Sequence, residues 1–329
     1  MPDFTDLIDL ASERLGASVL WANDEFFAPK EALLKPSPAE WREGAYTERG
    51  KWMDGWETRR RREPGHDWCL VRLGAPGVVH GVVIDTAFFR GNYPDEAQVE
   101  GCDVAGVPDP VLLDTDARIR WVTLVPRAPL AGDAKNAFPV SHPGRVTHLR
   151  LRIYPDGGVA RLRVHGQVTL DPALERAVRE LDFAAMENGG FVEVCSDMFF
   201  GHRQNLILPG RSTHMGDGWE TKRRRGPGND WTIVRLGARA TLGRVELDTD
   251  HFRGNAPGSV MLEWCDLPRA TPEQLVASTA WRELVPATRV QPHARHQWGA
   301  PAGATATHVR LSIYPDGGVA RLRLFGTAA

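Results

Sequence analysis

The chain has 329 residues, of which 42% are hydrophobic and 25% are charged, and its 40 Lys and Arg nearly balance its 42 Asp and Glu. These values are typical of a globular protein with about two domains. The net charge of −2 argues against a general nucleic-acid binder, which needs positive charge to neutralise phosphates. No stretch reaches the roughly 18 apolar residues of a membrane helix, so we expect no membrane association.

The N-terminal sequence MPDFTDLIDLASERLG is acidic and amphipathic, and it lacks the basic and apolar regions of a secretory signal. The four cysteines form no CxxC pair and no metal-finger spacing; they are Cys69, Cys102, Cys195 and Cys265. Buried thiols in a reducing compartment explain this pattern. We therefore expect a cytoplasmic protein without structural disulfides.

Most of the chain consists of an internal duplication. Three phrases recur in the same order, namely DGWET at Asp54 and Asp217, FRGN at Phe89 and Phe252, and IYPDGGVARLR at Ile153 and Ile313. The offset between copies is 163 for the first two phrases and 160 for the third. Two long copies exclude a solenoid and indicate two homologous domains in tandem, over residues 1–167 and 191–329.

The segment between the copies, residues 168–190, has the pattern of a helix. Asp171 is a suitable N-cap, Pro172 suits the first turn, and Gly189 suits the end. We predict a helical linker here.

Inside each copy the pattern is that of β-strands. Leu149, Leu151 and Ile153 alternate with polar residues, and so do Leu162 and Val164 after the YPDGG turn. This predicts a hairpin of residues 149–153 with residues 159–164. GVVHGVVIDT and LGRVELDTD read as further strands. Many short strands separated by Gly and Pro favour an all-β fold of two jelly-roll β-sandwich domains.

Loops at one end of a sandwich are the usual place for function. Each copy concentrates polar residues in two such loops, around the arginine run Arg59–Arg62 and its second version, and around FRGN. The candidate residues are Asp54, Glu57, His66, Arg90 and Asn92 in the first copy, and Asp217, Glu220, His251, Arg253 and Asn255 in the second. Arginine can grip a carboxylate with two hydrogen bonds, and asparagine offers both a donor and an acceptor.

A structural role is an alternative for the DGWET block, because its acids can pair with neighbouring arginines and its tryptophan can close the end of the sandwich. The second copy also has Asp248, Asp250 and His251, but alternation on a strand turns His251 away from the two acids, so we expect no metal site. The chain has no P-loop, GxGxxG, GxSxG or HExxH motif, and we expect no cofactor.

The duplicated phrases DGWETRRRR, DTAFFRGNYP and YPDGGVARLR, in this order and spacing, resemble the allantoicase (allantoate amidinohydrolase) family over nearly the whole chain. The resemblance implies two galactose-binding-like jelly rolls and the hydrolysis of allantoate to ureidoglycolate and urea. It supplies no catalytic residues, so the site assignment rests on the chemistry of the substrate.

Allantoate carries a carboxylate and two ureido groups on one carbon. We expect Arg90 or Arg253 to bind the carboxylate, Asn92 or Asn255 to hold a ureido group, and Glu57 or Glu220 to move protons. His251 and His66 are further candidates for proton transfer, and Asp54 and Asp217 for substrate binding. We also expect a homo-oligomer. The alternative function is a non-enzymatic tandem module that binds carbohydrate or anions.

Overall fold

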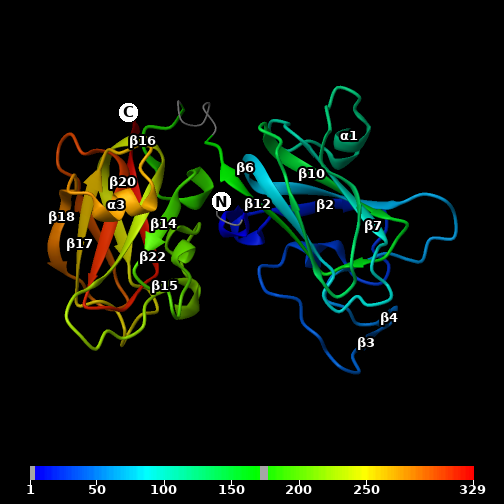
Figure 1. Cartoon of the computed structure of the whole chain (residues 1–329), viewed down its shortest axis with the longest axis horizontal. Helices are drawn as coiled ribbons and strands as arrows, with labels where there is room; N and C mark the ends of the chain where they lie inside the picture. The colour runs from blue at the N-terminus through cyan, green and yellow to red at the C-terminus, as the bar shows by residue number, and fades with distance from the viewer. Residues whose placement is uncertain (1–3, 171–176) are drawn as a thin grey trace. The chain divides into compact units, whose positions relative to one another are not determined.

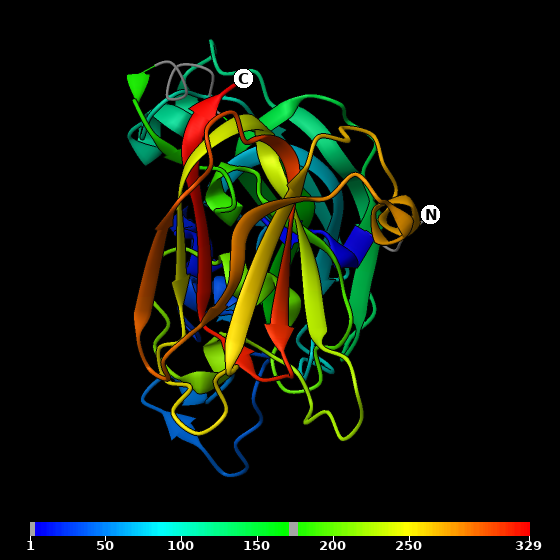
Figure 2. The same cartoon turned by 90° about the vertical axis from the view of Figure 1, so that its left-hand side faces the viewer.

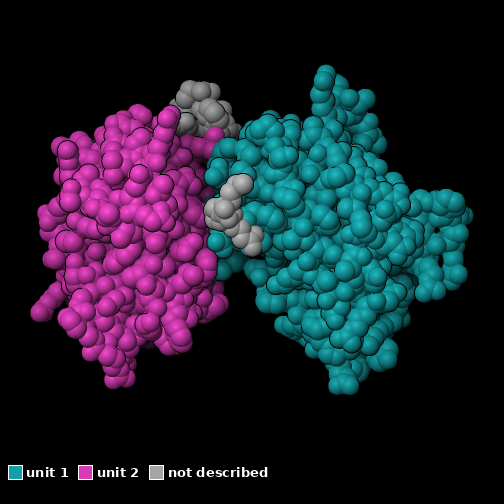
Figure 3. All heavy atoms as spheres, viewed as in Figure 1, with its two compact units in different colours: residues 1–169 teal, residues 170–329 magenta. Residues whose placement is uncertain are grey.

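The computed structural model describes residues 4–170 and 177–329. The chain forms two compact units, residues 1–169 and 170–329, which Figure 3 colours separately. Each unit is a β-sandwich, and Figure 1 shows their strands, with blue to green marking the first unit and green to red the second. The expectation of an all-β fold with two tandem jelly-roll sandwiches is therefore confirmed.

The first unit is built from short 3₁₀ helices, one short α-helix and many strands. In chain order they are η1 (Phe4–Asp6), β1 (Ile8–Asp9), η2 (Glu13–Leu15), β2 (Ser18–Ala22), η3 (Lys30–Leu34), β3 (Tyr46–Thr47), β4 (Gly50–Lys51), β5 (Trp56–Glu57), β6 (Asp67–Asp85), β7 (Glu96–Cys102), α1 (Pro110–Thr115), β8 (Val122–Pro129), β9 (Lys135–Pro139), β10 (Arg145–Tyr154), β11 (Gly158–Val159) and β12 (Arg161–Val168).

Strand β6 organises this unit because it contributes to both layers of the sandwich. Its first part, near Cys69, pairs with β2 and β10, and β7 and β8 extend this layer. Its last part, near Val82, pairs with β12 and β9, and β1 adds to β12. The apolar side chains between the layers, including Leu149 and Leu162, are fully buried, and this burial is the main favourable contribution to folding.

The second unit repeats this plan. Its elements are β13 (Leu181–Asp182), η4 (Met186–Asn188), β14 (Phe191–Cys195), η5 (Arg203–Ile207), η6 (Met215–Asp217), β15 (Trp219–Glu220), β16 (Asp230–Asp248), β17 (Ser259–Cys265), α3 (Pro272–Ala277), β18 (Arg282–Arg289), β19 (Arg295–Gly299), β20 (Thr305–Tyr314), β21 (Gly318–Val319) and β22 (Arg321–Ala328). Strand β16 takes the place of β6 and pairs with β14, β19, β20 and β22. Figure 2 turns this unit toward the viewer.

The predicted hairpin between residues 149–153 and 159–164 is wrong. Both segments are strands, β10 and β12, but each pairs with a different part of β6 instead of with the other. The YPDGG segment therefore carries the chain from one layer to the other. Alternation of apolar residues gave the strands correctly, but a long strand shared by both layers cannot be read from local pattern.

The predicted linker helix is wrong over its second half. Leu181–Asp182 form strand β13, which pairs with β22, and Met186–Asn188 form the 3₁₀ helix η4. These elements match β1 and η2 of the first unit, so the second repeat begins where a linker was expected. The predicted N-terminal part of the helix, residues 171–176, lies outside the described residues.

In the part of the chain that the structure describes, none of the helices has the length and apolar character needed to span a bilayer.

Candidate active site

Three duplicated phrases of the sequence meet at one end of the first unit. Strand β5, from DGWET, pairs with β11, from YPDGG. The N–H of Gly158 on β11 donates to the carbonyl of Asn92 in the FRGN loop at 2.7 Å. A Cβ at Gly158 would overlap the ring of the buried Phe89, at 1.9 Å, so only glycine permits this approach. The repeats thus preserve one compact junction rather than three separate features.

Glu57 and Asn92 form the polar centre of this junction. The amide Nδ2 of Asn92 donates to Oε1 of Glu57 at 2.7 Å. Burial raises the pKa of the Glu57 carboxyl, and the hydrogen bond from Asn92 offsets part of this rise. An ionised carboxylate can only accept hydrogen bonds, so the Asn92 amide must turn its Nδ2 toward Glu57. The amide oxygen Oδ1 is then left to accept hydrogen bonds from other partners.

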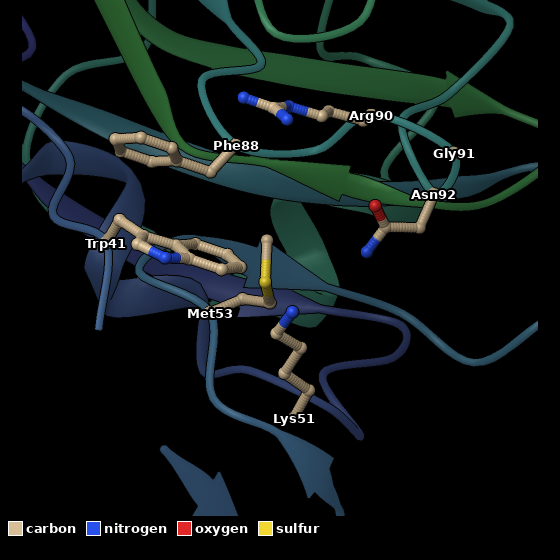
Figure 4. A pocket seen from close by; sticks show the side chains of 7 residues that line it. All are labelled: Trp41, Lys51, Met53, Phe88, Arg90, Gly91 and Asn92. Carbon is tan, nitrogen blue, oxygen red and sulfur yellow. The ribbon is translucent and has the colours of Figure 1, made fainter. Parts of the chain in front are cut away.

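A cavity of about 470 Å³ opens beside this pair. Figure 4 shows the side chains that surround it, which are Trp41, Lys51, Met53, Phe88, Arg90 and Asn92, with Gly91 completing the lining. The rings of Trp41 and Phe88 lie 5.8 Å apart and form an apolar wall. The cavity therefore combines two cations, one amide and an aromatic surface, which suits a small organic anion that also has hydrogen-bonding groups.

Arg90 is held at the mouth of the cavity by Asp133. Arg90 Nε donates to Asp133 Oδ2 at 3.0 Å, and the backbone N–H of Phe88 donates to Oδ1 at 2.8 Å. The Phe88 bond and then Arg90 lower the pKa of Asp133. Phe88 and Asp133 both have positive φ, 70° and 50°. Such a backbone is unfavourable for a bulky residue and is common at ligand sites.

Trp41 and Lys51 were missed by sequence reasoning. They lie in residues 35–53, between η3 and Asp54, whereas the second repeat has only residues 208–216 between η5 and Asp217. The offset between the copies falls from 173 to 163 across this loop, so the first repeat is longer by ten residues. An insertion in one copy has no counterpart among the shared sequence segments, so these segments do not reveal it. The change in offset between the copies does indicate it.

Asp54 is committed to structural contacts. Its Oδ2 accepts from Arg161 Nη2 at 2.5 Å and from the N–H of Glu40 at 3.0 Å, and its Oδ1 accepts from Lys35 Nζ at 2.8 Å. Burial raises the pKa of Asp54, but these bonds outweigh it and lower the pKa overall. Arg161 is 1% exposed and also donates to the carbonyl of Ser37. These contacts favour a structural role over the predicted substrate binding.

Asp217 repeats this arrangement in the second unit. Its Oδ2 accepts from Arg321 Nη2 at 3.2 Å and from the N–H of Thr213 at 3.1 Å. Like those of Asp54, the contacts of Asp217 hold a loop in place and favour a structural role over the predicted substrate binding.

The structure does not bring His66 to the cavity. Its Nε2 lies 3.3 Å from Nη1 of Arg152, and its ring lies 5.0 Å from that of Tyr154, on the face formed by β7 and β10. Burial, followed by the charges of Arg152 and Arg61, lowers the pKa of His66. The prediction of a proton-transfer role for His66 has no geometric support.

Two members of the arginine run pair with acids. Arg61 is partly buried, and its Nη1 donates to Asp67 at 2.8 Å, whereas Arg59 is exposed and its Nε donates to Asp24 at 2.7 Å. Arg60 and Arg62 are exposed. Trp56 is fully buried, and its Nε1 donates to the carbonyl of Asp24 at 2.7 Å. Most residues of the DGWET block and of the arginine run that follows it therefore make structural contacts, which agrees with the alternative of a structural role.

The second unit keeps the central pair and changes its surroundings. Asn255 Nδ2 donates to Glu220 Oε1 at 2.6 Å, and Arg253 Nη2 lies 3.3 Å from Nε2 of His293. His251 and His293 stand where the first unit has Phe88 and Asp133, again with positive φ.

His251 does not separate from the acids as strand alternation predicted. Strand β16 ends at Asp248, and His251 Nε2 lies 3.8 Å from Asp250 Oδ2 and 3.1 Å from the carbonyl of Ser212. Asp250 also pairs with His293 at 2.9 Å. Across residues 4–170 and 177–329, no three or more His, Cys, Asp or Glu side chains are arranged to hold a metal ion.

A duplicated jelly roll whose first unit carries a cavity lined by two cations and an amide belongs to the class of proteins with a site suited to small organic anions. A family model described as the allantoicase repeat matches residues 8–169 and 181–329. The chain is 50% identical to a probable allantoicase of Streptomyces coelicolor, over 98% of this chain and 86% of the relative. It is 46% identical to probable allantoicase 1 of Burkholderia mallei, over 99% and 96%.

A solved structure agrees with these relatives. The crystal structure of allantoicase from Saccharomyces cerevisiae superposes with a TM-score of 0.81 at 35% identity, and the match covers 97% of this chain and 92% of that one. The chain belongs to the allantoicase family.

Proposed function

We propose that this protein hydrolyses allantoate to ureidoglycolate and urea, and that the reaction takes place in the cavity of the first unit. Membership of the family supports the reaction. One observation supports this location of the reaction: Arg90, Lys51 and Asn92 line one cavity, and Asn92 is hydrogen-bonded to Glu57. The equivalent region of the second unit lacks the longer loop that supplies Lys51 and Trp41.

The groups around the cavity match the parts of the substrate. The cations Lys51 and Arg90 suit the carboxylate and ureido oxygens of the substrate, because charge-assisted hydrogen bonds are the stronger class. The Oδ1 atom of Asn92, left available by the bond between Nδ2 and Glu57, accepts from a ureido N–H. The apolar wall of Trp41 and Phe88 suits the planar face of the other ureido group.

Glu57 is the proposed proton carrier. Water attacks the central carbon, a C–O bond forms, and the C–N bond to one ureido group breaks. Glu57 takes a proton from the attacking water and passes it to the departing nitrogen, so that urea leaves neutral. Its raised pKa brings it nearer to neutrality, where such a carrier is more effective.

Urea release from allantoate by the purified protein is the test. Arg90→Lys keeps the charge but removes the planar fork, so we expect kcat/KM to fall by about 10-fold or more, the loss of one charged hydrogen bond. Arg253→Lys is the matched control in the second unit and should change little. Binding of allantoate without any urea release by the wild-type protein would contradict the proposal and favour a binding module.

We also propose that the protein is a cytoplasmic homo-oligomer. Its four cysteines are free thiols, and burial raises the pKa of Cys102 and Cys265 to about 12, which keeps them unreactive. Free thiols fit a reducing compartment. Light scattering after size-exclusion chromatography measures the assembly, and a mass equal to the chain's 36.4 kDa would contradict the oligomer.

A further inference from the structure

We propose that Lys51, rather than Arg90, is the residue that binds the carboxylate of the substrate. This inference rests on the proposed function, since it names the anchoring group of the same cavity. Sequence comparison between the repeats does not reveal it, because Lys51 lies in the loop that the second repeat lacks.

The ammonium group of Lys51 is an uncompensated charge at the cavity. No carboxylate among residues 4–170 and 177–329 forms a salt bridge with it, and its described contact is with the ring of Trp41, 4.2 Å from Nζ to the centroid. The neutral ring does not cancel the positive charge of the ammonium, so Lys51 still attracts an anion. Figure 4 shows the ammonium of Lys51 beside Met53, below and to one side of Asn92. Lys51 and Asn92 line the same cavity, so a carboxylate bound by Lys51 lies in the cavity that also contains the amide.

Arg90 is less suited to this task. Its Nε is already bonded to Asp133, and this pairing neutralises much of its charge. Lys51 and Arg90 are both exposed, so the pairing of Arg90 is what distinguishes them. A cation that is already paired contributes less to the binding of a further anion. The orientation in Figure 4 agrees, because the guanidinium extends toward Phe88 and away from Asn92. Arg90 therefore remains for the carbonyl oxygen of a ureido group.

The position of Lys51 is well defined by its hairpin. Strands β3 and β4 pair with each other, and the N–H of Trp52 donates to the carbonyl of Ala45 at 2.9 Å. Arg49 Nη1 donates to the carbonyl of Phe26 at 3.2 Å, which joins the hairpin to the rest of the unit. These hydrogen bonds connect the backbone around Lys51 to the rest of the unit.

The experiment compares charge-removing and charge-keeping variants on a charged and a neutral substrate. Lys51→Met preserves the length of the side chain, and Lys51→Arg preserves its charge. Lys135→Met is the matched control, since Lys135 is an exposed lysine on β9 of the same unit that does not line the cavity. The substrates are allantoate and its primary amide, which lacks the carboxylate charge.

We expect Lys51→Met to raise the KM for allantoate by about 10- to 100-fold with a much smaller change in kcat, as for lost charged binding in both ground and transition states. Its kinetics with the amide should match those of the wild-type protein. Lys51→Arg should recover most of the affinity for allantoate. These three results together distinguish anchoring of the carboxylate from a structural role, which would affect both substrates.

An unchanged KM for allantoate in Lys51→Met, relative to Lys135→Met, would overturn the inference. So would an equal loss with both substrates. If the wild-type protein released no urea, the proposed function would fail by itself. Calorimetric titration of allantoate into the wild-type and Lys51→Met proteins would then decide the role of Lys51 from affinity alone.

Discussion

Glu57 and Asn92 come from phrases 35 residues apart, yet they form one hydrogen-bonded pair, and the second unit reproduces this pair in Glu220 and Asn255. The two pairs differ in what surrounds them. Only the first lies beside the cavity with Lys51 and Trp41 in the part of the chain that the structure describes. At the scale of single residues, the repeats therefore share a framework and differ in what it can bind.

Glu57→Gln tests this difference. Without a proton carrier, we expect kcat to fall by about 10²- to 10⁴-fold. In the wild-type protein, kcat/KM should fall with falling pH at a value above the usual glutamate range, because burial raises the pKa of Glu57 and the base must be ionised. The variant should lose this acidic limb. Steady-state kinetics from pH 4 to pH 9 measure both effects.

Glu220→Gln in the second unit is the control for this experiment, because Glu220 has the same asparagine partner but lies in the repeat that lacks the longer loop with Lys51 and Trp41. An equal loss in the two variants would mean that the glutamate holds the junction together instead of moving protons.

The loop of residues 35–53 is the element that makes the two units unequal. Arg161 holds its start, by donating to the carbonyls of Ser37 and Pro38 and to the carboxylate of Asp54. In the second unit Arg321 donates to the carbonyl of Gly210 and to Asp217 in the same way. Both loops therefore have the same attachment, and the longer one also carries Trp41 and Lys51, which line the cavity of the first unit.

Replacing residues 35–53 with residues 208–216 should produce a folded protein without activity. The shorter segment brings its own acceptors for a buried arginine, so we expect the melting temperature to stay near that of the wild-type protein. Urea release should fall to the background because Lys51 and Trp41 are removed. Differential scanning calorimetry and the urea assay measure the two properties.

Arg211→Ala, in the short loop of the second unit, is the control for the loop exchange and should keep its activity. An exchanged protein that still released urea at the wild-type rate would place the active site elsewhere.

Across the whole molecule, each sandwich has a buried histidine at the same place, on β10 in the first unit and on β20 in the second. His148 and His308 are 1% and 2% exposed, and each Nδ1 contacts the hydroxyl of the preceding threonine at 2.9 and 3.0 Å. Burial, followed by Arg72 for His148 and Arg235 for His308, lowers the pKa of both to about 4. The folded protein therefore keeps both rings neutral.

This predicts a loss of stability in mild acid. The unfolded chain protonates these histidines below about pH 6.5, whereas the folded chain does so near pH 4, so their contribution is complete above pH 6.5 and is lost on acidification between the two values. At pH 5 the cost is about 2 kcal/mol per histidine. The double variant His148→Gln/His308→Gln should show a flatter dependence of unfolding free energy on pH.

Denaturation by urea at pH 7 and pH 5 measures this dependence, with the exposed His214→Gln as the control. If the unfolding free energy of the double variant fell as much between pH 7 and pH 5 as that of the wild-type protein, other groups would cause the loss of stability.

Sequence reasoning identified what is local and repeated. It found the strands, the duplication and the residues of the Glu57–Asn92 pair, because period-2 patterns and recurring phrases carry that information. It did not find the partners of β10, because a strand of 19 residues that serves both layers has no local signature. It placed His66 near the site because the two are close in sequence, but β7 and β10 hold His66 on another face. It missed Lys51, which has no second copy.

The guanidinium of Arg161 joins the start of the loop of residues 35–53 directly to a strand of the sandwich interior. A loop fastened in this way has little freedom to open before its support does. On gradual heating, the thermal inactivation curve of the enzyme should therefore coincide with the melting of its first unit, instead of preceding it as in enzymes whose active-site loops loosen early.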